Sequence, residues 1–139
     1  MKRLPILLAL LALHPAPAAF AQAKADTVLR AKYIRCGAIL GAASLAMPGT
    51  KRGDAYAGAA LVVGVWAAKL DEAAGMAPGA ATDAAGREIG TTLLELARGA
   101  RTGASAEESA QYVVQTNAQE LEQCTETFRR EATRLRGGK

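Results

Sequence analysis

The sequence predicts an all-α protein: a small antiparallel four-helix bundle whose first and last helices are joined by a disulfide. Apolar residues recur at three- and four-residue spacings in four segments, which is the pattern of amphipathic helices. Alanine is abundant and aromatic residues make up only 4% of the chain, so the helices can pack closely. The predicted helices are residues 26–47, 54–74, 83–99 and 105–136, and together they form a single domain, residues 24–139.

Residues 1–23 have the pattern of a secretory signal peptide. Two basic residues precede an apolar run, Leu4–Leu13, that is too short to span a bilayer as a permanent helix. Small residues at Ala21 and Ala23 suit a signal peptidase, so we expect cleavage after Ala23. The overlapping site Ala19–Ala21 is one alternative, and an uncleaved N-terminal anchor is another. No cysteine closely follows the apolar run, so we expect a periplasmic or secreted protein that is not a lipoprotein.

Removal of the signal peptide changes the charge of the chain. It takes two of the 17 basic residues and none of the 13 acidic ones, so the net charge falls from +4 to +2. A charge this small gives little support to nucleic-acid binding.

Cys36 and Cys124 are expected to form the one intramolecular disulfide that two cysteines allow, because an exported protein meets an oxidising compartment. Each cysteine lies on the apolar stripe of its own predicted helix, with Tyr33 and Leu40 around the first and Leu121 and Phe128 around the second. The bond would therefore join the first helix to the last. Two buried free thiols are the alternative, and the closely spaced Cys-x-x-Cys redox motif is absent.

The first two predicted helices form a hairpin. Asp26 or Thr27 can cap the first helix, and Pro48-Gly49 ends it. The short turn at residues 49–53 then predicts that the second helix, capped by Asp54, folds back antiparallel. Four glycines in these helices are expected to allow close backbone approach: Gly37, Gly41, Gly58 and Gly64.

The second helix is predicted to be the central and most buried member of the bundle, because it is apolar nearly all round. One stripe runs from Tyr56 to Leu70, while Leu61, Val62 and Val65 fall on the far side. This second apolar face is a candidate surface for a partner or a lipid. The candidate partner-binding residues are Val62, Val65, Trp66 and Lys69, and the alternative for Trp66 is a place in the core.

The third and fourth helices complete the bundle. Residues 75–81 have the composition of a linker, and Thr82 or Asp83 can start the third helix. Ser105 and Glu108 have the spacing of a capping box, which predicts the start of the fourth and longest helix. In an up-down-up-down order the two cysteines lie at similar heights, and residues 105–112 overhang the bundle or fold over its end.

The same arrangement gathers basic residues toward one end of the bundle. These residues are candidates for contact with an anionic lipid surface or an acidic partner. The alternative is a solvated rim with acidic residues interspersed. The candidates for this contact are Arg30, Lys32, Arg35, Arg129, Arg130, Arg134 and Arg136.

Several kinds of chemistry are missing from the sequence. The only histidine, His14, lies in the predicted signal peptide, which removes Ser-His and Cys-His dyads and histidine metal ligands from the mature chain. The chain also lacks a Cys-x-x-Cys-His haem motif and a glycine-rich phosphate loop after a strand. We therefore expect a protein that is not an enzyme and that uses neither a metal nor another cofactor.

In layout the chain resembles the small exported helical proteins of bacteria whose ends are fastened by one disulfide, a group that includes periplasmic chaperones and toxin-immunity proteins. The expected function is a non-enzymatic protein-binding module, such as an envelope accessory, chaperone-like or immunity-type protein, whose partner is another envelope or secreted protein. The alternative is a membrane-surface or lipid-handling protein that uses the small-residue hairpin and the basic end. The sequence leaves the oligomeric state open.

Overall fold

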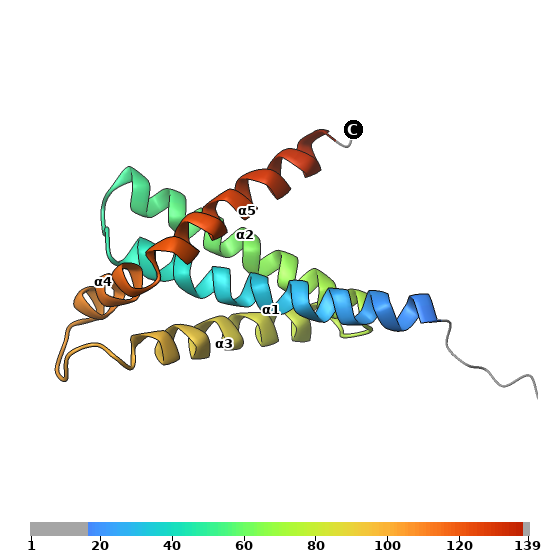
Figure 1. Cartoon of the computed structure of the whole chain (residues 1–139), viewed down its shortest axis with the longest axis horizontal. Coiled ribbons are helices and arrows are strands. Elements are labelled where there is room, and N and C mark those ends of the chain that lie inside the picture. Colours follow the sequence, from blue (N-terminus) through green and yellow to red (C-terminus); the bar gives the residue numbers. More distant parts are fainter. Residues whose placement is uncertain (1–16, 138–139) are drawn as a thin grey trace, which may run out of the picture.

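A computed structural model describes residues 17–137 of the chain, and these residues form five helices and no strand. The all-α class is confirmed, but the described chain has five helices where four were predicted. Residues 1–16 of the predicted signal peptide lie outside the described residues. The helices are α1 (Pro17–Leu45), α2 (Lys51–Ala73), α3 (Pro78–Ala97), α4 (Ala106–Thr116) and α5 (Ala118–Gly137) (Figure 1).

Helix α1 is the centre of the fold, because it contacts each of the other four helices. Between Tyr33 and Ala43 only Arg35 is exposed, and Ile39 and Leu40 have no exposed surface at all. Helix α2 packs on α1 and α3 but leaves its outer side in solvent. The prediction that the second helix is the central one is therefore wrong. Helix α2 and the part of α1 after Cys36 are both apolar nearly all round, and the number of neighbouring helices decides which of them is buried.

The turn between α1 and α2 is built by Thr50, which caps α2. Its Oγ1 accepts a hydrogen bond from the amide of Gly53 and donates one to the carbonyl of Met47, both at 2.9 Å. Asp54, the predicted cap, instead lies in the first turn, where its charge suits the helix dipole. A Cβ atom on Gly53 would lie 2.2 Å from the Met47 carbonyl oxygen, so this turn requires glycine there.

Helices α1 and α3 begin earlier than predicted. Asp26 and Thr27 lie inside α1 and cap nothing; the Thr27 hydroxyl donates to the carbonyl of Ala23 one turn before it. Helix α3 begins at Pro78, after Ala77 in an extended conformation. The fixed φ of proline suits the first helical position, so residues 78–81 are helix where a linker was predicted.

Two of the four glycines predicted to allow close backbone approach make space for a side chain of α3, not for the backbone of a neighbouring helix. A Cβ added to Gly37 or Gly64 would lie 2.8 or 3.3 Å from Cδ1 of Ile89 on α3. The two glycines therefore make room for Ile89 where α3 packs on the α1–α2 hairpin. At Gly41 and Gly58 an added Cβ would meet nothing within 4 Å, so the predicted close backbone approach is not what these residues provide.

The predicted helix 105–136 is broken at Asn117, which separates α4 from α5. The Asn117 side chain donates to the carbonyl of Val113 at 2.8 Å, and the Thr116 hydroxyl donates to that of Tyr112 at 2.8 Å. Polar side chains that bond these carbonyls compete with the regular helix ladder and bend it. The start of α4 is as predicted, because Ser105 and Glu108 form a complete capping box.

Helix α4 folds over the end of the α1–α3 unit, which is one of the two arrangements expected for the start of the fourth predicted helix. Val113 is fully buried there in a small cluster with Ala42 and Ala110, and Leu93 and Leu96 of α3 pack against it. This end of the molecule is therefore closed by its own apolar contacts.

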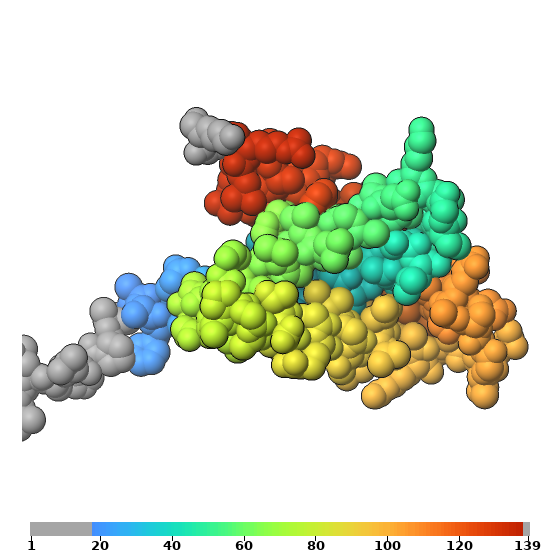
Figure 2. All heavy atoms as spheres, turned by 180° about the vertical axis from the view of Figure 1, so that it is seen from behind, coloured from blue at the N-terminus to red at the C-terminus, as the bar shows by residue number. Residues whose placement is uncertain are grey.

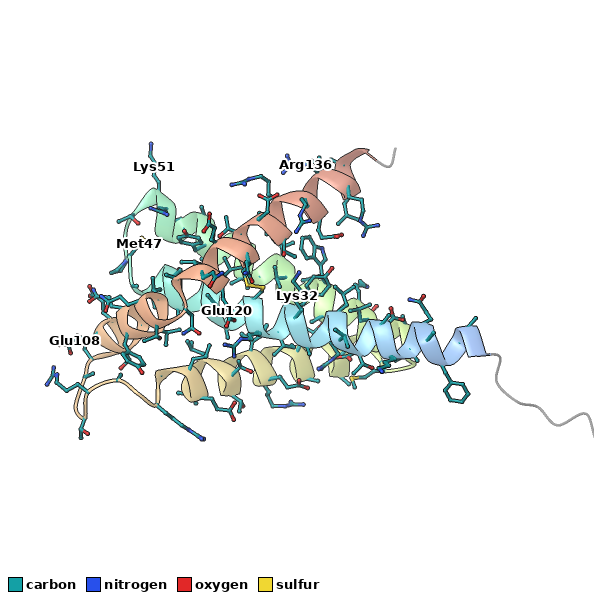
Figure 3. All side chains as sticks on the ribbon, in the orientation of Figure 1. Lys32, Met47, Lys51, Glu108, Glu120 and Arg136 are labelled. Atoms are coloured by element: carbon teal, nitrogen blue, oxygen red, sulfur yellow. A yellow bond between two sulfur atoms is a disulfide. The ribbon has the colours of Figure 1, made fainter. Side chains whose placement is uncertain are left out.

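Helix α5 crosses α1 and α2 obliquely, and its last turns extend away from the other helices (Figure 1). Seen from behind, it stands above α2 at the edge of the molecule (Figure 2). The Cys36–Cys124 disulfide joins α1 to α5 as predicted, with the two Cα atoms 5.3 Å apart (Figure 3). Leu135 follows Phe128 after seven residues, a spacing that predicts it on the same core stripe, but 55% of its surface is exposed, because α5 has left the bundle by that point.

Candidate functional site

Three large aliphatic side chains form an exposed row on α2. Leu61 is 74% exposed, Val65 53% and Val62 39%, while Val63 and Ala67 on the opposite side of the same helix are buried. The predicted position of these residues on the far side is confirmed. We refer to Leu61, Val62 and Val65 as the outer face of α2. Exposed apolar side chains that gather on one face of a helix are a candidate site for the binding of another molecule.

Trp66 lies beside this face and supports it from within. Its ring packs between Tyr33 of α1 and Phe128 of α5, with centroid distances of 5.5 and 5.9 Å, and it is partly buried. The aromatic group thus ties three helices together next to the disulfide. Trp66 is the only tryptophan in the chain, so its fluorescence reports on this junction.

The four predicted partner-binding residues therefore have different environments. Val62 and Val65 are exposed, and Trp66 packs between helices. Lys69 is exposed, and its Nζ lies 2.6 Å from a carboxylate oxygen of Glu72 one turn later. All four lie within residues 62–69 of α2, but only Val62 and Val65 belong to its exposed apolar face.

Next to the outer face lies a cleft between α5 and the first half of α2, of about 280 Å³. Ala55 and Ala59 form its α2 wall, Phe128 and Ala132 form its α5 wall, and Leu40 of α1 lies beneath. We call this cleft the α2–α5 wedge. The polar residues that complete its lining are Tyr56, Thr125, Arg129, Thr133 and Arg136. Sequence reasoning did not identify the wedge, because no sequence pattern gives the angle at which α5 crosses α2.

The end of α5 is strongly basic. Residues 129–136 hold four arginines and one glutamate, and we call them the basic arm. Arg129 and Arg130 pair with Glu126, and Arg134 pairs with Glu131, all within α5. Arg136 makes no ion pair with any residue in the range 17–137, and it lies at the far end of the helix (Figure 3).

Arg30, predicted for an anionic surface, instead holds three helices together. It donates two hydrogen bonds to the carboxylate of Glu88 on α3, at 2.7 and 2.8 Å, and a third to Asp71 on α2. Asp71 is nine-tenths buried, and its second oxygen has no hydrogen-bond partner among the described residues. The hydrogen bonds from Arg30 lower the pKa of Glu88, and the carboxylates in turn raise the pKa of Arg30.

Arg35 has a similar role between α1 and α5. Its guanidinium donates two hydrogen bonds to Glu120, close to the disulfide, and this contact lowers the pKa of Glu120. The basic end predicted from the sequence is therefore divided. Arg30 and Arg35 are used for interhelical pairing, while Lys32 and the basic arm face solvent.

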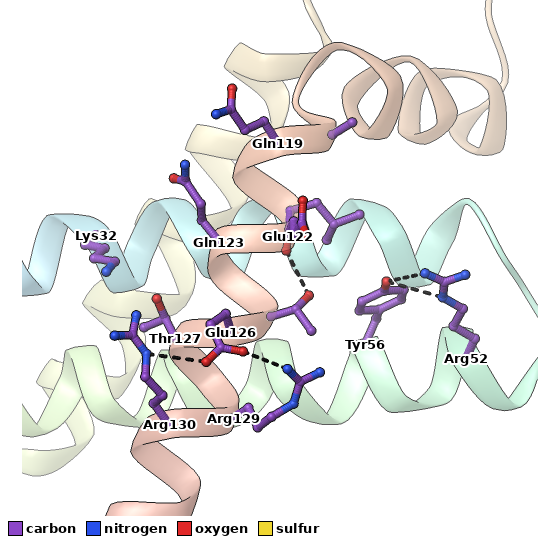
Figure 4. Close-up of a pocket in the computed structure, with 13 residues that line it drawn as sticks. Lys32, Arg52, Tyr56, Gln119, Glu122, Gln123, Glu126, Thr127, Arg129 and Arg130 are labelled. Atoms are coloured by element: carbon purple, nitrogen blue, oxygen red, sulfur yellow. Dashed lines mark hydrogen bonds and ion pairs between the residues drawn. The ribbon is translucent and has the colours of Figure 1, made fainter.

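A larger depression of about 840 Å³ runs along α5 (Figure 4). Lys32 lies on one side of α5 in this view, and Arg52 and Tyr56 lie on the other, where Arg52 donates to the Tyr56 hydroxyl. Glu122 and Glu126 balance the cations along its length. The depression is open and carries both signs of charge, so it has the character of a solvated surface rather than of an enclosed binding pocket.

Within the described residues, no group of three or more histidine, cysteine, aspartate or glutamate side chains is placed to hold a metal ion. Over the same range, no helix combines the length and the apolar character that are needed to cross a membrane. Comparisons with protein-family models, with curated proteins and with solved structures give no match to this chain.

Proposed function

We propose that this chain is an exported, non-enzymatic protein-binding module of the cell envelope, in the manner of an accessory, chaperone-like or immunity-type protein. The observation that carries the proposal is the outer face of α2, where Leu61 and Val65 expose more than half of their surface on a well-packed helix. Fully burying a leucine or valine side chain is worth roughly 1.5–3 kcal/mol, and a partner that covers the exposed part of Leu61 and Val65 would gain a share of that free energy.

Export is supported by the disulfide, because such bonds persist in oxidising compartments. It is also supported by the start of α1. Residues 18–25 are all exposed, so cleavage after Ala23 would remove no core side chain from the described part of the chain. We expect the mature chain to begin at Lys24, and the intact mass of the purified protein tests this.

A binding role, rather than catalysis, is supported by the residue types of the mature chain. With His14 in the proposed signal peptide, that chain has no histidine to act as a general base. The carboxylates of Asp71, Glu88 and Glu120 are also engaged in interhelical pairing with arginines.

A membrane-surface role is the second candidate, and the basic arm is the observation that favours it. Flotation with anionic vesicles at low salt distinguishes it from protein binding, because a lipid-binding chain rises with the vesicles. Under our proposal the chain stays unbound while its protein partner is still captured.

The test of the proposed function is affinity capture from the protein's own cell envelope with two matched variants. Leu61→Asp places a charge on the outer face of α2. Leu94→Asp does the same on α3, where Leu94 is 71% exposed. We expect both variants to fold, since exposed substitutions usually change stability by less than about 0.5 kcal/mol. Only Leu61→Asp should lose the captured protein. Equal capture by both variants, or no captured protein with the unchanged chain, would contradict the proposal.

A further inference from the structure

The apolar stripe of α5 continues beyond the core. Leu121, Cys124 and Phe128 pack against the bundle, and Leu135 follows Phe128 at a spacing of seven residues on the same side of the helix. Leu135 nevertheless exposes 55% of its surface, because the end of α5 extends away from the other helices (Figure 1). A core stripe that continues without a neighbour indicates room for one more packed segment.

Helix α2 offers the opposite wall for that segment. Ala55 and Ala59 line the wedge, and Val62 extends the same flank by one turn, with 39% of its surface exposed. Alanine side chains allow a neighbouring backbone to approach closely. The apolar part of the wedge is therefore made by Leu40, Ala55, Ala59, Phe128 and Ala132.

The charge around this surface is positive. Arg129 and Arg136 line the wedge itself, and the basic arm as a whole carries four arginines against one glutamate. An arginine that forms no ion pair with the described residues, such as Arg136, gains most from a carboxylate brought by a partner. The complementary surface is apolar with acidic residues beside it.

The size of the cleft favours a protein segment over a lipid. Small-molecule sites enclose roughly 70–90% of their ligand, whereas this cleft is open along its length and holds about 280 Å³. That volume suits one or two side chains of a partner, which is how anchor residues fill pockets at protein interfaces.

We propose that the α2–α5 wedge seats an acidic amphipathic helix of the partner protein. Its apolar side chains pack in the wedge and extend over Leu135 beyond it, and its carboxylates pair with Arg136, the one arginine of the basic arm that forms no ion pair within residues 17–137. This inference rests on the proposed function, because it names the binding surface and the chemistry of the partner.

The test uses a tryptophan-free model peptide of about 15–20 residues, long enough to form a helix in its complex. It carries leucine and alanine on one face and glutamate on the other, and a second peptide carries lysine in place of glutamate. The purified exported chain is titrated at about 0.15 M salt, where the interactions of remote charges are largely screened. Because Trp66 packs on Phe128 at the wedge, its emission is the readout.

We expect the acidic peptide to shift the Trp66 emission saturably and the basic peptide to leave it unchanged. Leu135→Ala and Arg136→Glu should each weaken binding by about five- to tenfold, the cost of losing an anchor contact. Leu94→Ala and Arg87→Glu, the matched changes on α3, should alter it by less than about twofold, since α3 makes no contact with α5. Urea unfolding of all four variants checks that each one is folded.

Equal binding of the two peptides, or equal effects of the α5 and α3 variants, would overturn the inference. A shift caused by anionic vesicles and not by the acidic peptide would also overturn it, in favour of a lipid surface. The same variants separate this inference from the proposed function in envelope capture. If capture needs Leu61 but is indifferent to Leu135 and Arg136, the binding module stands and the wedge is not its seat.

Discussion

Reduction of the Cys36–Cys124 bond should lower the free energy of unfolding by about 4.6 kcal/mol at 25 °C. The two cysteines are 88 residues apart, and the chain-entropy relation for a closed loop gives about 15 cal/mol/K for that length. Domains of this size are stable by only about 5–15 kcal/mol in total. The reduced protein should therefore be close to the limit of stability.

In the reduced protein, unfolding should begin at α5, because few contacts besides the disulfide hold that helix to the bundle. The Trp66–Phe128 contact is worth about 0.5–1.5 kcal/mol, and the exposed Arg35–Glu120 pair about 0.2–1 kcal/mol. Together these two contacts contribute less to the free energy of unfolding than the disulfide does. On reduction, Trp66 emission should change at lower urea concentrations than the helical circular dichroism signal of the remaining helices.

Urea unfolding of the oxidised and the reduced chain measures this effect. With a slope of about 2 kcal/mol per molar urea, the midpoint should fall by about 2.3 M on reduction. A Cys36→Ala/Cys124→Ala variant is the control, because its midpoint should not respond to the reductant. A shift of less than about 0.5 M in the unchanged chain would refute the reasoning, since it would leave the bond contributing only about 1 kcal/mol.

Three further predictions concern single contacts. Gly53→Ala should destabilise the protein by about 2 kcal/mol or more, because its Cβ would meet the carbonyl oxygen of Met47. Gly58→Ala has open space around it and should instead stabilise the protein by about 0.5–1 kcal/mol. Equal shifts of the melting temperature in the two variants would contradict this prediction. Arg30→Met should lower the free energy of unfolding by about 3–5 kcal/mol, because it leaves Asp71 buried without its cation. Adding Asp71→Leu should recover more than half of that loss, as measured by urea unfolding. No recovery would show that loss of the ion pair is not the cause. The lowered pKa of Glu120 means that its contribution is present above the ordinary glutamate pKa and is lost as the pH falls through the lowered value. Glu120→Gln should therefore cost about 0.5 kcal/mol at pH 7 and progressively less as the pH falls through the lowered pKa of Glu120, and a difference that is constant with pH would count against the Arg35 contact.

Local signals predicted local features of the fold. The helical phase of Cys36 and Cys124 placed both on buried stripes, which was enough to anticipate the bond between the outer helices. The Ser105–Glu108 spacing fixed the start of α4, because a capping box is complete within four residues. Neither prediction required knowledge of how the helices pack.

At the helix boundaries that were predicted wrongly, the sequence contains signals that allow more than one interpretation. Thr50 and Asp54 are both good caps, and Thr50 prevails because Gly53 lets the chain turn back on Met47. The break at Asn117 has its signal in two adjacent polar residues, Thr116 and Asn117, whose side chains bond the helix carbonyls. Such residues also occur in unbroken helices, so the sequence pattern alone did not distinguish the two cases.

The candidate site depends on tertiary arrangement, and the sequence could supply only part of it. The far-side position of Leu61 and Val65 follows from helical spacing alone. The exposure of Leu135, the wedge and the use of Arg30 for interhelical pairing all depend on the angles at which helices cross. Crossing angles arise from the packing of whole helix surfaces, which periodicity does not encode.

The most direct test of the binding role is photo-crosslinking in the cells that produce the protein. A photoreactive amino acid is placed at Val65 on the outer face of α2 in one strain and at Leu94 on α3 in another; both positions are exposed on helices. A module that binds its partner through α2 gives a discrete heavier adduct from position 65 and none from position 94. Adducts of equal intensity from both positions, or adducts with lipid alone, would contradict it.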